Sequence, residues 1–181
     1  MTQELFRTFI AITLSSEERE KISQLIKTLT VNENFKDLKW VKLDNLHLTL
    51  HFSGNISKSQ IDNIIPALNN LTDAFQSVTL NATALKLFPN KNHPKTLALE
   101  YDVPKSIQEV HETIKQLLLR QNVPVEIRPL RLHLSLAKVQ PKIGNFPELD
   151  IDLSLYQLSA KDIHLYHSTR DETGLIYMKI C

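Results

Sequence analysis

Apolar residues recur along the chain with two different spacings, every second position in some segments and every third or fourth in others. The first spacing predicts half-buried strands, and the second predicts helices that bury one face. Helices are predicted from the SSEE segment at 15–18 onward, with Ser15 or Ser16 as its cap, after Ser57, and over about 105–121. Ser57 and Gln60 form a capping-box pattern, and Pro66 is expected to kink or shorten the helix that follows.

The strand pattern occupies the segments between these helices. Strands are predicted at 5–14, 38–41, 46–53, 76–87, 96–101, 130–139, 151–158, 162–168 and 175–180. The whole chain has three glycines, so we find no flexible linker that would separate two domains. We therefore predict that residues 1–181 form one α+β domain of two pseudo-symmetric lobes, each an antiparallel sheet with helices on its outer face, around a central cleft.

Composition narrows the class of protein. The 181 residues are 42% hydrophobic and suffice for one ordinary domain. The net charge of +1 neither requires nor forbids a polyanionic partner, so nucleic-acid contacts would need local basic groups. Cys181 is the sole cysteine and the last residue, which excludes an intramolecular disulfide. With no signal-peptide pattern and no run of ~18 apolar residues, we expect a cytoplasmic monomer without membrane contact.

One four-residue phrase occurs twice. HLTL at residues 47–50 recurs as HLSL at residues 133–136. In a strand, the histidine and the hydroxyl share one face ~6–7 Å apart, and the leucines share the other. The leucines would then pack in the core while the polar pair lines a cleft. An amphipathic strand that merely faces water would also alternate, but it does not require the same residue pair at a matched position in a second half.

Two imidazoles and two hydroxyls in one cleft suit phosphodiester chemistry. Because imidazole titrates near ~6.5, one of His47 and His133 can act as a neutral base and the other as a charged acid. Each such group contributes typically ~10²–10⁴-fold to a rate. The hydroxyls of Thr49 and Ser135 can donate to phosphoryl oxygens. This chemistry requires no metal ion and no cofactor, and the sequence does not show which histidine is the acid.

Other residues have plainer interpretations. His51 follows His47 by four residues, which on a helix would suggest a zinc pair. In a strand the two rings are ~13 Å apart, so we interpret His51 as a residue of the cleft rim or the surface. Phe9 and Trp40 are expected in the core, whereas Tyr166 is a candidate for ligand contact. The scattered basic residues favour recognition of a nucleic-acid terminus or a short oligonucleotide over an extended duplex.

The paired motifs resemble those of the two-histidine phosphoesterase superfamily, and flanking segments resemble its RNA 2',3'-cyclic phosphodiesterase branch, also called 2'-5' RNA ligases. RTFIAI at 7–12 is similar to the opening strand of that branch, and W-V-x-x-x-N-L-H-L-T-L at 40–50 to the run into its first motif. LFPNKNHPKTLAL at 87–99 resembles the segment between its lobes, and DIHLYHSTRDETGLIYMKI at 162–180 its last hairpin.

This resemblance implies an activity. Members hydrolyse a 2',3'-cyclic phosphate at an RNA end, or in a small nucleotide, to a 2'-phosphomonoester without a metal, and can join RNA ends by a 2'-5' bond in the reverse sense. By motif position, His47 would be the proton donor and His133 the proton acceptor, with Thr49 and Ser135 holding the phosphate. Residues 1–181 would be the whole phosphoesterase domain.

The sequence departs from the family pattern at two places. Lys138 stands where an arginine often follows the second motif, which keeps the charge but loses the bidentate fork. Leu130-Arg131-Leu132 replaces a Thr-Pro type of lead into that motif. Arg131 shares a strand face with His133, so it either binds substrate or is a solvated charge. A non-catalytic nucleotide-binding module and a 2'-5' oligonucleotide phosphodiesterase are alternative functions.

Overall fold

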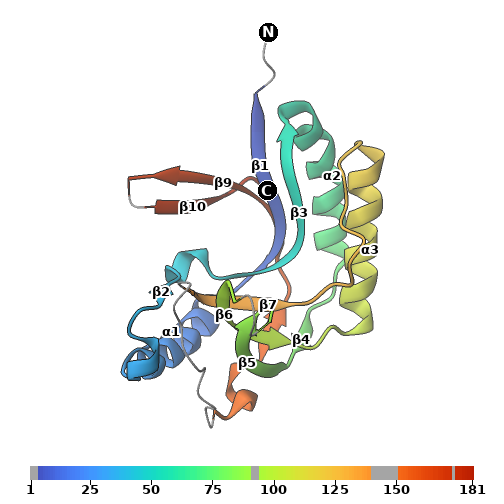
Figure 1. Ribbon diagram of the computed structural model, residues 1–181. Coiled ribbons are helices and arrows are strands. Elements are labelled where there is room, and N and C mark those ends of the chain that lie inside the picture. The colour runs from blue at the N-terminus through green and yellow to red at the C-terminus, as the bar shows by residue number, and fades with distance from the viewer. Residues whose placement is uncertain (1–3, 91–93, 140–150, 173) are drawn as a thin grey trace.

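The computed structural model describes residues 4–90, 94–139, 151–172 and 174–181 (Figure 1). Three helices are present in these ranges: α1 (Ser16–Thr30), α2 (Lys58–Ala74) and α3 (Lys105–Arg120). Three short 3-10 helices accompany them: η1 (Glu33–Phe35), η2 (Leu43–Asn45) and η3 (Leu153–Tyr156). The strands are β1 (Leu5–Thr13), β2 (Lys39–Trp40), β3 (His47–Ser57), β4 (Val78–Leu80), β5 (Ala82–Phe88), β6 (Thr96–Tyr101), β7 (His133–Lys138), β8 (Leu158–Ala160), β9 (Ile163–Asp171) and β10 (Gly174–Lys179).

Eight of these strands form one antiparallel sheet. Its order is β10-β9-β1-β3-β7-β6-β5, with β2 paired to the free part of β7. A separate pair is formed by β4 and β8. The strands β3 and β7, which carry the repeated phrase, lie next to each other and pair through Leu48 and Leu134. The prediction of an α+β fold with antiparallel sheets is confirmed.

The two lobes are interleaved in sequence and do not correspond to successive halves of the chain. One lobe consists of β1, β3, β9 and β10, and the other of β2, β5, β6 and β7. The C-terminal hairpin joins the first lobe because β1 pairs with β3 on one edge and with β9 on the other. This double pairing completely buries the apolar side chains in the middle of β1, such as Ile10. Figure 1 shows the β9–β10 hairpin projecting to the side opposite α2 and α3.

The helices begin where the sequence predicts. Ser15 caps α1 and Ser57 caps α2, each in a reciprocal capping box that satisfies backbone donors at the helix start. Pro66 does not shorten α2, which continues to Ala74. The apolar face on both sides of Pro66 is buried, and this packing holds the second half of the helix in place. None of the described helices is both long and apolar enough to cross a membrane.

The helices pack on the outside of the sheet. In Figure 1, α2 and α3 lie side by side along β3, and α1 lies near β2 at the opposite end of the molecule. A single hydrophobic cluster includes residues of both lobes and of all three helices. The leucines of both repeated phrases belong to it. The opposite face of β3 and β7 is therefore left for the polar residues of the two phrases.

Candidate active site

The two repeated phrases converge on one pocket of about 380 Å³. It is lined by Val41, Asn45, His47, Thr49, Phe52, Lys95, Thr96, His133, Ser135, Lys138 and Tyr177. Both histidines, both hydroxyl residues and Lys138 of the sequence prediction therefore face the same space. Two lysines and no carboxylate occur among these lining residues, which favours an anionic ligand.

The pairing of β3 with β7 gives the pocket an approximate two-fold arrangement. Leu48 pairs with Leu134 in an antiparallel register, and both side chains are fully buried. Extending that register by one residue in each direction sets His47 across from Ser135 and His133 across from Thr49. Each imidazole thus faces the hydroxyl supplied by the other strand. A phosphate held between the strands can contact both kinds of group from both sides.

A β-bulge occurs near the end of each repeated phrase, and the two bulges change which residues face the pocket. The register of β3 with β1 shifts at Leu50, and the register of β7 with β6 shifts at Leu136. An extra residue at a β-bulge reverses the alternation of the residues beyond it. Phe52 and Lys138 consequently return to the side of the imidazoles and line the pocket.

The bulge also overturns the prediction for His51. Strict alternation placed it on the face of His47 and at the cleft rim or the surface, but its side chain is only 3% exposed. Its ring lies 6.1 Å from that of His111 on α3, centre to centre. Burial lowers the pKa of both imidazoles, and their mutual repulsion lowers the pKa of His51 further. His51 therefore packs between β3 and α3, where it also lines a cavity that adjoins the pocket.

Both pocket imidazoles are held in the same way. His47 Nδ1 donates to the carbonyl of Asn45 at 2.7 Å, and His133 Nδ1 donates to the carbonyl of Arg131 at 3.0 Å. In each case the acceptor lies two residues earlier in the chain. Because Nδ1 carries the hydrogen, the neutral ring has its lone pair on Nε2. Each histidine is therefore set to accept or return a proton through Nε2.

His47 is enclosed by aromatic rings. Its ring centre lies 4.8 Å from that of Phe9 and 5.0 Å from the edge-on ring of Tyr177. Burial lowers the pKa of His47 to about 4, the bond to the Asn45 carbonyl opposes this, and the charge of His133 adds to it. His47 is thus neutral at neutral pH in the free protein.

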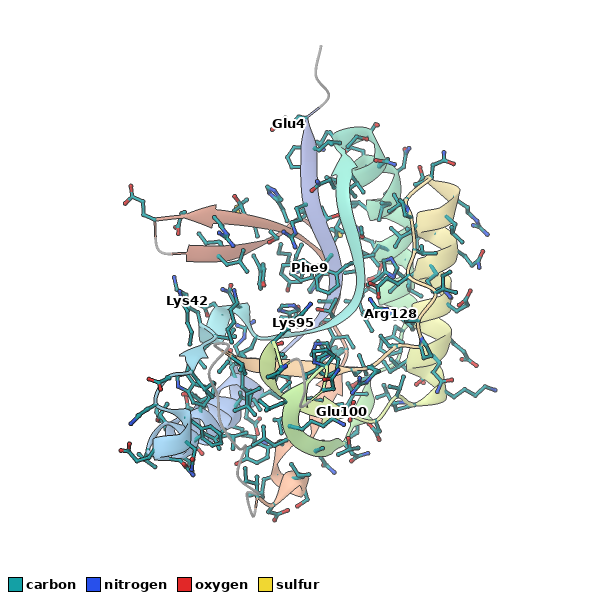
Figure 2. The ribbon with its side chains drawn as sticks, viewed as in Figure 1. Glu4, Phe9, Lys42, Lys95, Glu100 and Arg128 are labelled. Carbon is teal, nitrogen blue, oxygen red and sulfur yellow. The ribbon has the colours of Figure 1, made fainter. Side chains whose placement is uncertain are left out.

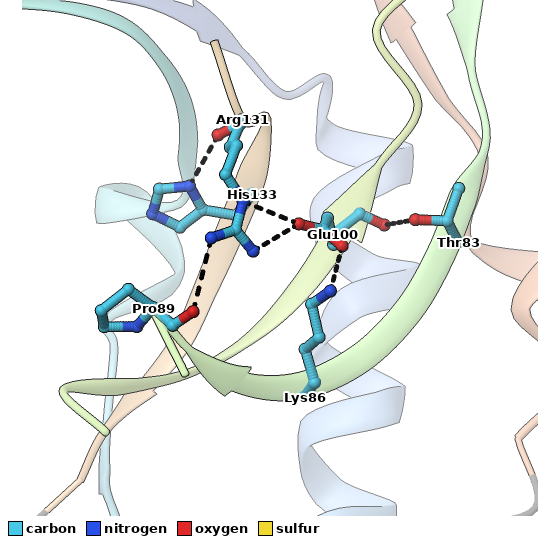
Figure 3. Close-up of polar contacts among 6 residues, drawn as sticks. All are labelled: Thr83, Lys86, Pro89, Glu100, Arg131 and His133. Atoms are coloured by element: carbon cyan, nitrogen blue, oxygen red, sulfur yellow. Dashed lines mark hydrogen bonds and ion pairs between the residues drawn. The ribbon is translucent and has the colours of Figure 1, made fainter. Parts of the chain in front are cut away.

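His133 lies in a more polar setting (Figure 3). Its ring stacks on Phe88 with the centres 3.8 Å apart, and Glu100 is its cross-strand partner on β6. Burial lowers the pKa of His133, and the Arg131 guanidinium lowers it further. The Arg131 carbonyl and the Glu100 carboxylate act in the opposite direction. A carboxylate therefore favours the charged form of His133.

Arg131 is engaged beside the pocket. Its Nε and Nη2 donate to one oxygen of Glu100 at 3.2 and 2.8 Å, while the other oxygen pairs with Lys86. The guanidinium carbon also lies 4.5 Å from the centre of the Phe88 ring. Figure 3 shows this network, which fixes the residue whose carbonyl orients His133. Arg131 lines an adjoining groove and is absent from the residues that line the pocket.

The aromatic candidates are not among the residues that line the pocket, and Trp40 lines a smaller neighbouring cavity. Phe9 is buried, as predicted, and Figure 2 shows it between β1 and the β9–β10 hairpin. Tyr166 stacks on Phe9 at 5.2 Å, and its hydroxyl bonds to that of Thr13 at 2.6 Å. The hairpin residue that lines the pocket is Tyr177. Tyr166 thus lies one layer behind the surface that a ligand would contact.

Comparison with known proteins agrees with this geometry. A family model described as LigT like phosphoesterase matches residues 12–98, which include the first histidine phrase. A curated RNA 2',3'-cyclic phosphodiesterase of Thermotoga maritima is 26% identical over 173 residues, which cover 94% of this chain and 91% of that protein. One of Archaeoglobus fulgidus is 24% identical over 178 residues, covering 94% and 96%. The chain thus resembles the LigT-like phosphoesterases over residues 12–98, and curated RNA 2',3'-cyclic phosphodiesterases over nearly its whole length.

Solved structures share the fold of this protein. Escherichia coli LigT in complex with 3'-AMP superposes with a TM-score of 0.74 at 20% identity, over 98% of this chain and 97% of that one. A Thermus thermophilus protein superposes with a TM-score of 0.79 at 18% identity, over 97% and 95%.

Sequence reasoning missed several residues that line the pocket, among them Phe52, Lys95, Thr96 and Tyr177. Phe52 was hidden by the bulge, and the others come from segments whose neighbours in the sheet the pattern does not reveal. Thr96 Oγ1 donates to the carbonyl of Ala137 at 2.7 Å, which ties β6 to the bulge in β7. In the part of the chain that the structure describes, no three histidine, cysteine or acidic side chains gather closely enough to hold a metal ion.

Proposed function

We propose that this phosphoesterase hydrolyses 2',3'-cyclic phosphates, at RNA ends or in small nucleotides, to 2'-phosphomonoesters by metal-independent acid–base catalysis. The observation that carries this proposal is the pair of imidazoles in one pocket, each with Nδ1 bonded to a carbonyl and Nε2 left for proton transfer. The curated relatives bear the name of this activity. The complex of E. coli LigT with 3'-AMP supports a nucleotide ligand.

The proposed reaction is a single in-line displacement at phosphorus. His133 Nε2 takes a proton from water as the water oxygen attacks the phosphorus atom. The bond from phosphorus to the ribose O3' breaks, and protonated His47 delivers its proton to that oxygen. Water is consumed, and the products are a 2'-phosphate and a free 3'-hydroxyl. A ribose 5'-hydroxyl in place of water would give a 2'-5' bond.

The remaining polar groups of the pocket would stabilise the developing charge. The Thr49 and Ser135 hydroxyls lie across from the imidazoles and can donate to the two non-bridging oxygens. Lys138 at the end of β7 and Lys95 just before β6 supply positive charge without needing a bidentate contact.

The substrate itself would bring His47 into its acidic form. In the free protein burial holds the pKa of His47 at about 4, so the ring is neutral at neutral pH. A phosphodiester anion within contact distance favours the charged form and raises the pKa. Proton uptake on binding would then leave one of the two imidazoles charged. The acid is thus created only when a phosphate occupies the pocket.

Product analysis tests the proposal. RNA ending in a 2',3'-cyclic phosphate, incubated with the protein in EDTA, should give a 2'-monoester and no 3'-monoester. His47→Asn and His133→Asn should each lower the rate at least ~100-fold, because asparagine keeps a donor near the Nδ1 position but cannot act as an acid or a base near neutral pH. His167→Asn, on β9 outside the pocket, is the matched control. A strict need for divalent metal, or near-normal rates in either pocket variant, would contradict the mechanism.

The same experiment separates catalysis from simple binding. Thermal stabilisation by a 2',3'-cyclic nucleotide without any product would indicate a nucleotide-binding module instead.

We further propose that residues 1–181 act as one domain and as a monomer, since both histidines of the pocket come from one chain. Sedimentation of the active protein checks this point.

A further inference from the structure

A second cavity of about 580 Å³ adjoins the pocket on the side of His133. We call it the side groove. It shares Thr49, Phe52, Lys95, Thr96 and His133 with the pocket, so the two spaces are continuous. Its other lining residues include Phe88, Glu126, Arg128 and Arg131. Its volume falls in the range of sites that hold a small ligand.

The side groove carries positive charge in a protein that is almost neutral overall. Lys95, Arg128 and Arg131 line it with one carboxylate, Glu126, and the charge of Arg131 is paired with Glu100 beside the groove. The whole chain has a net charge of +1. Arg128 donates to Glu126 at 2.9 Å, but both side chains are largely exposed, and such a pair is worth little. An anionic ligand can therefore replace Glu126 as the partner of Arg128 at a small cost in free energy. Figure 2 shows Lys95 near the centre of the molecule and Arg128 toward α3, and both line the groove.

An exposed aromatic ring stands where the groove meets the pocket. Phe52 is 56% exposed and lines both spaces, and its ring centre lies 6.0 Å from that of buried Phe9. The backbone bulge holds it on the polar face of β3, where strict alternation would have put it in the core. A nucleobase can cover such a ring, whereas a phosphate cannot gain from it.

The pocket has another neighbour, which fits a nucleotide less well. A cavity of about 140 Å³ lies on its other side, lined in part by Lys39, Trp40 and Leu175. It is basic as well, but its volume is below the range of small-ligand sites. Size and the exposed ring together favour the side groove.

We propose that the side groove binds the nucleotide that precedes the cyclic end of a single-stranded RNA. The terminal nucleotide would occupy the pocket, Phe52 would stack on the preceding base, and Arg128 and Lys95 would contact the connecting phosphodiester. This inference rests on the proposed function and adds a substrate class to it. The preferred substrate is an RNA of at least two nucleotides, and a third nucleotide adds little because the groove holds one.

The test compares three substrates: uridine 2',3'-cyclic phosphate, UpU ending in a 2',3'-cyclic phosphate, and the corresponding UpUpU. The dinucleotide should exceed the mononucleotide in kcat/KM about tenfold, the value of one stacked base. The trinucleotide should equal the dinucleotide within about twofold. Increasing salt should lower kcat/KM more steeply for the dinucleotide, by about 0.7 in the log–log slope for its additional phosphate contact.

Variants locate the effect. Phe52→Ala should lower the ratio of dinucleotide to mononucleotide kcat/KM about tenfold, and Arg128→Gln should lower it about threefold and reduce the extra salt slope. Arg120→Gln, in the last turn of α3 and outside all three cavities, removes the same charge and should leave the ratio unchanged. Lys39→Gln probes the smaller cavity.

The outcomes are distinguishable. Equal kcat/KM for mononucleotide and dinucleotide would overturn the inference and leave the proposed function standing. A dinucleotide advantage that depends on Lys39 but not on Arg128 or Phe52 would overturn it too, by placing the preceding nucleotide on the other side. If neither substrate is cleaved, the proposed function fails, and the affinities of uridine 2'-phosphate and UpU 2'-phosphate then decide the inference in the same way.

Discussion

Burial of His47 should make the stability of the protein depend on pH in a way that one substitution removes. The folded state lowers the pKa of this imidazole from 6.5 to about 4. Between these two values the unfolded chain binds a proton that the folded protein does not. The contribution of neutral His47 is therefore complete above pH 6.5 and is lost as the pH falls toward 4.

The size of the effect follows from the same two pKa values. At about pH 4.5 nearly all unfolded chains carry the proton on this histidine but only about a quarter of the folded molecules do. The difference in proton binding costs about 2.5 kcal/mol of unfolding free energy relative to about pH 8. Other titrating groups also change stability over this range, so the comparison needs a variant that lacks only this group.

His47→Asn supplies that comparison, because asparagine can donate to the Asn45 carbonyl but does not titrate. Urea unfolding at about pH 8 and about pH 4.5 gives the free energy of unfolding for both proteins. Acidification should destabilise the wild type by about 2.5 kcal/mol more than it destabilises His47→Asn. Thr49→Val, a change in the same pocket without a titrating group, should behave like the wild type. If wild type and His47→Asn lose the same free energy, the imidazole is solvated and the reasoning is refuted.

Three further predictions concern catalysis and packing. Burial lowers the pKa of both His47 and His133 in the free protein, so the bell-shaped pH profile of kcat/KM should centre below about pH 6.5. The pH profile of kcat should lie higher, because bound phosphate raises both pKa values. Coincident profiles of kcat/KM and kcat would contradict this prediction. Glu100→Gln removes the carboxylate that favours protonated His133 and restrains Arg131. The value of kcat should therefore fall roughly threefold to tenfold, and the acid limb of its pH profile should move to lower pH. Glu112→Gln, on the exposed face of α3, should change neither kcat nor the pH profile. Leu134→Ala leaves a cavity at a fully buried position where the two lobes meet. Urea titration should show a loss of about 2–5 kcal/mol in the free energy of unfolding. Leu119→Ala, at an exposed position of α3, is the control.

The two histidine phrases show which features of the site the local sequence pattern could predict. The alternation in HLTL and HLSL was enough to assign leucines to the core and imidazoles to the opposite face, because side-chain direction in a regular strand depends only on position along it. The same holds for the capping boxes at Ser15 and Ser57, whose partners lie three residues away. The repetition of the phrase also indicated that the two strands share a role.

Where the pattern failed, the cause was contact between distant segments. The bulges at Leu50 and Leu136 arise from pairing with β1 and β6, and they move Phe52 and Lys138 into the pocket and His51 out of it. Arg131 was left open between substrate contact and solvated charge because its partner Glu100 lies on another strand.

Residues close in the chain thus decided which elements form and which face of β3 and β7 is polar. The pairing of those strands through Leu48 and Leu134 decided that both imidazoles enter one pocket and that the His47 ring is buried among Phe9 and Tyr177. Register, bulges and burial depend on which surfaces meet across the sheet, and the free energy that selects them comes from contacts far apart in sequence.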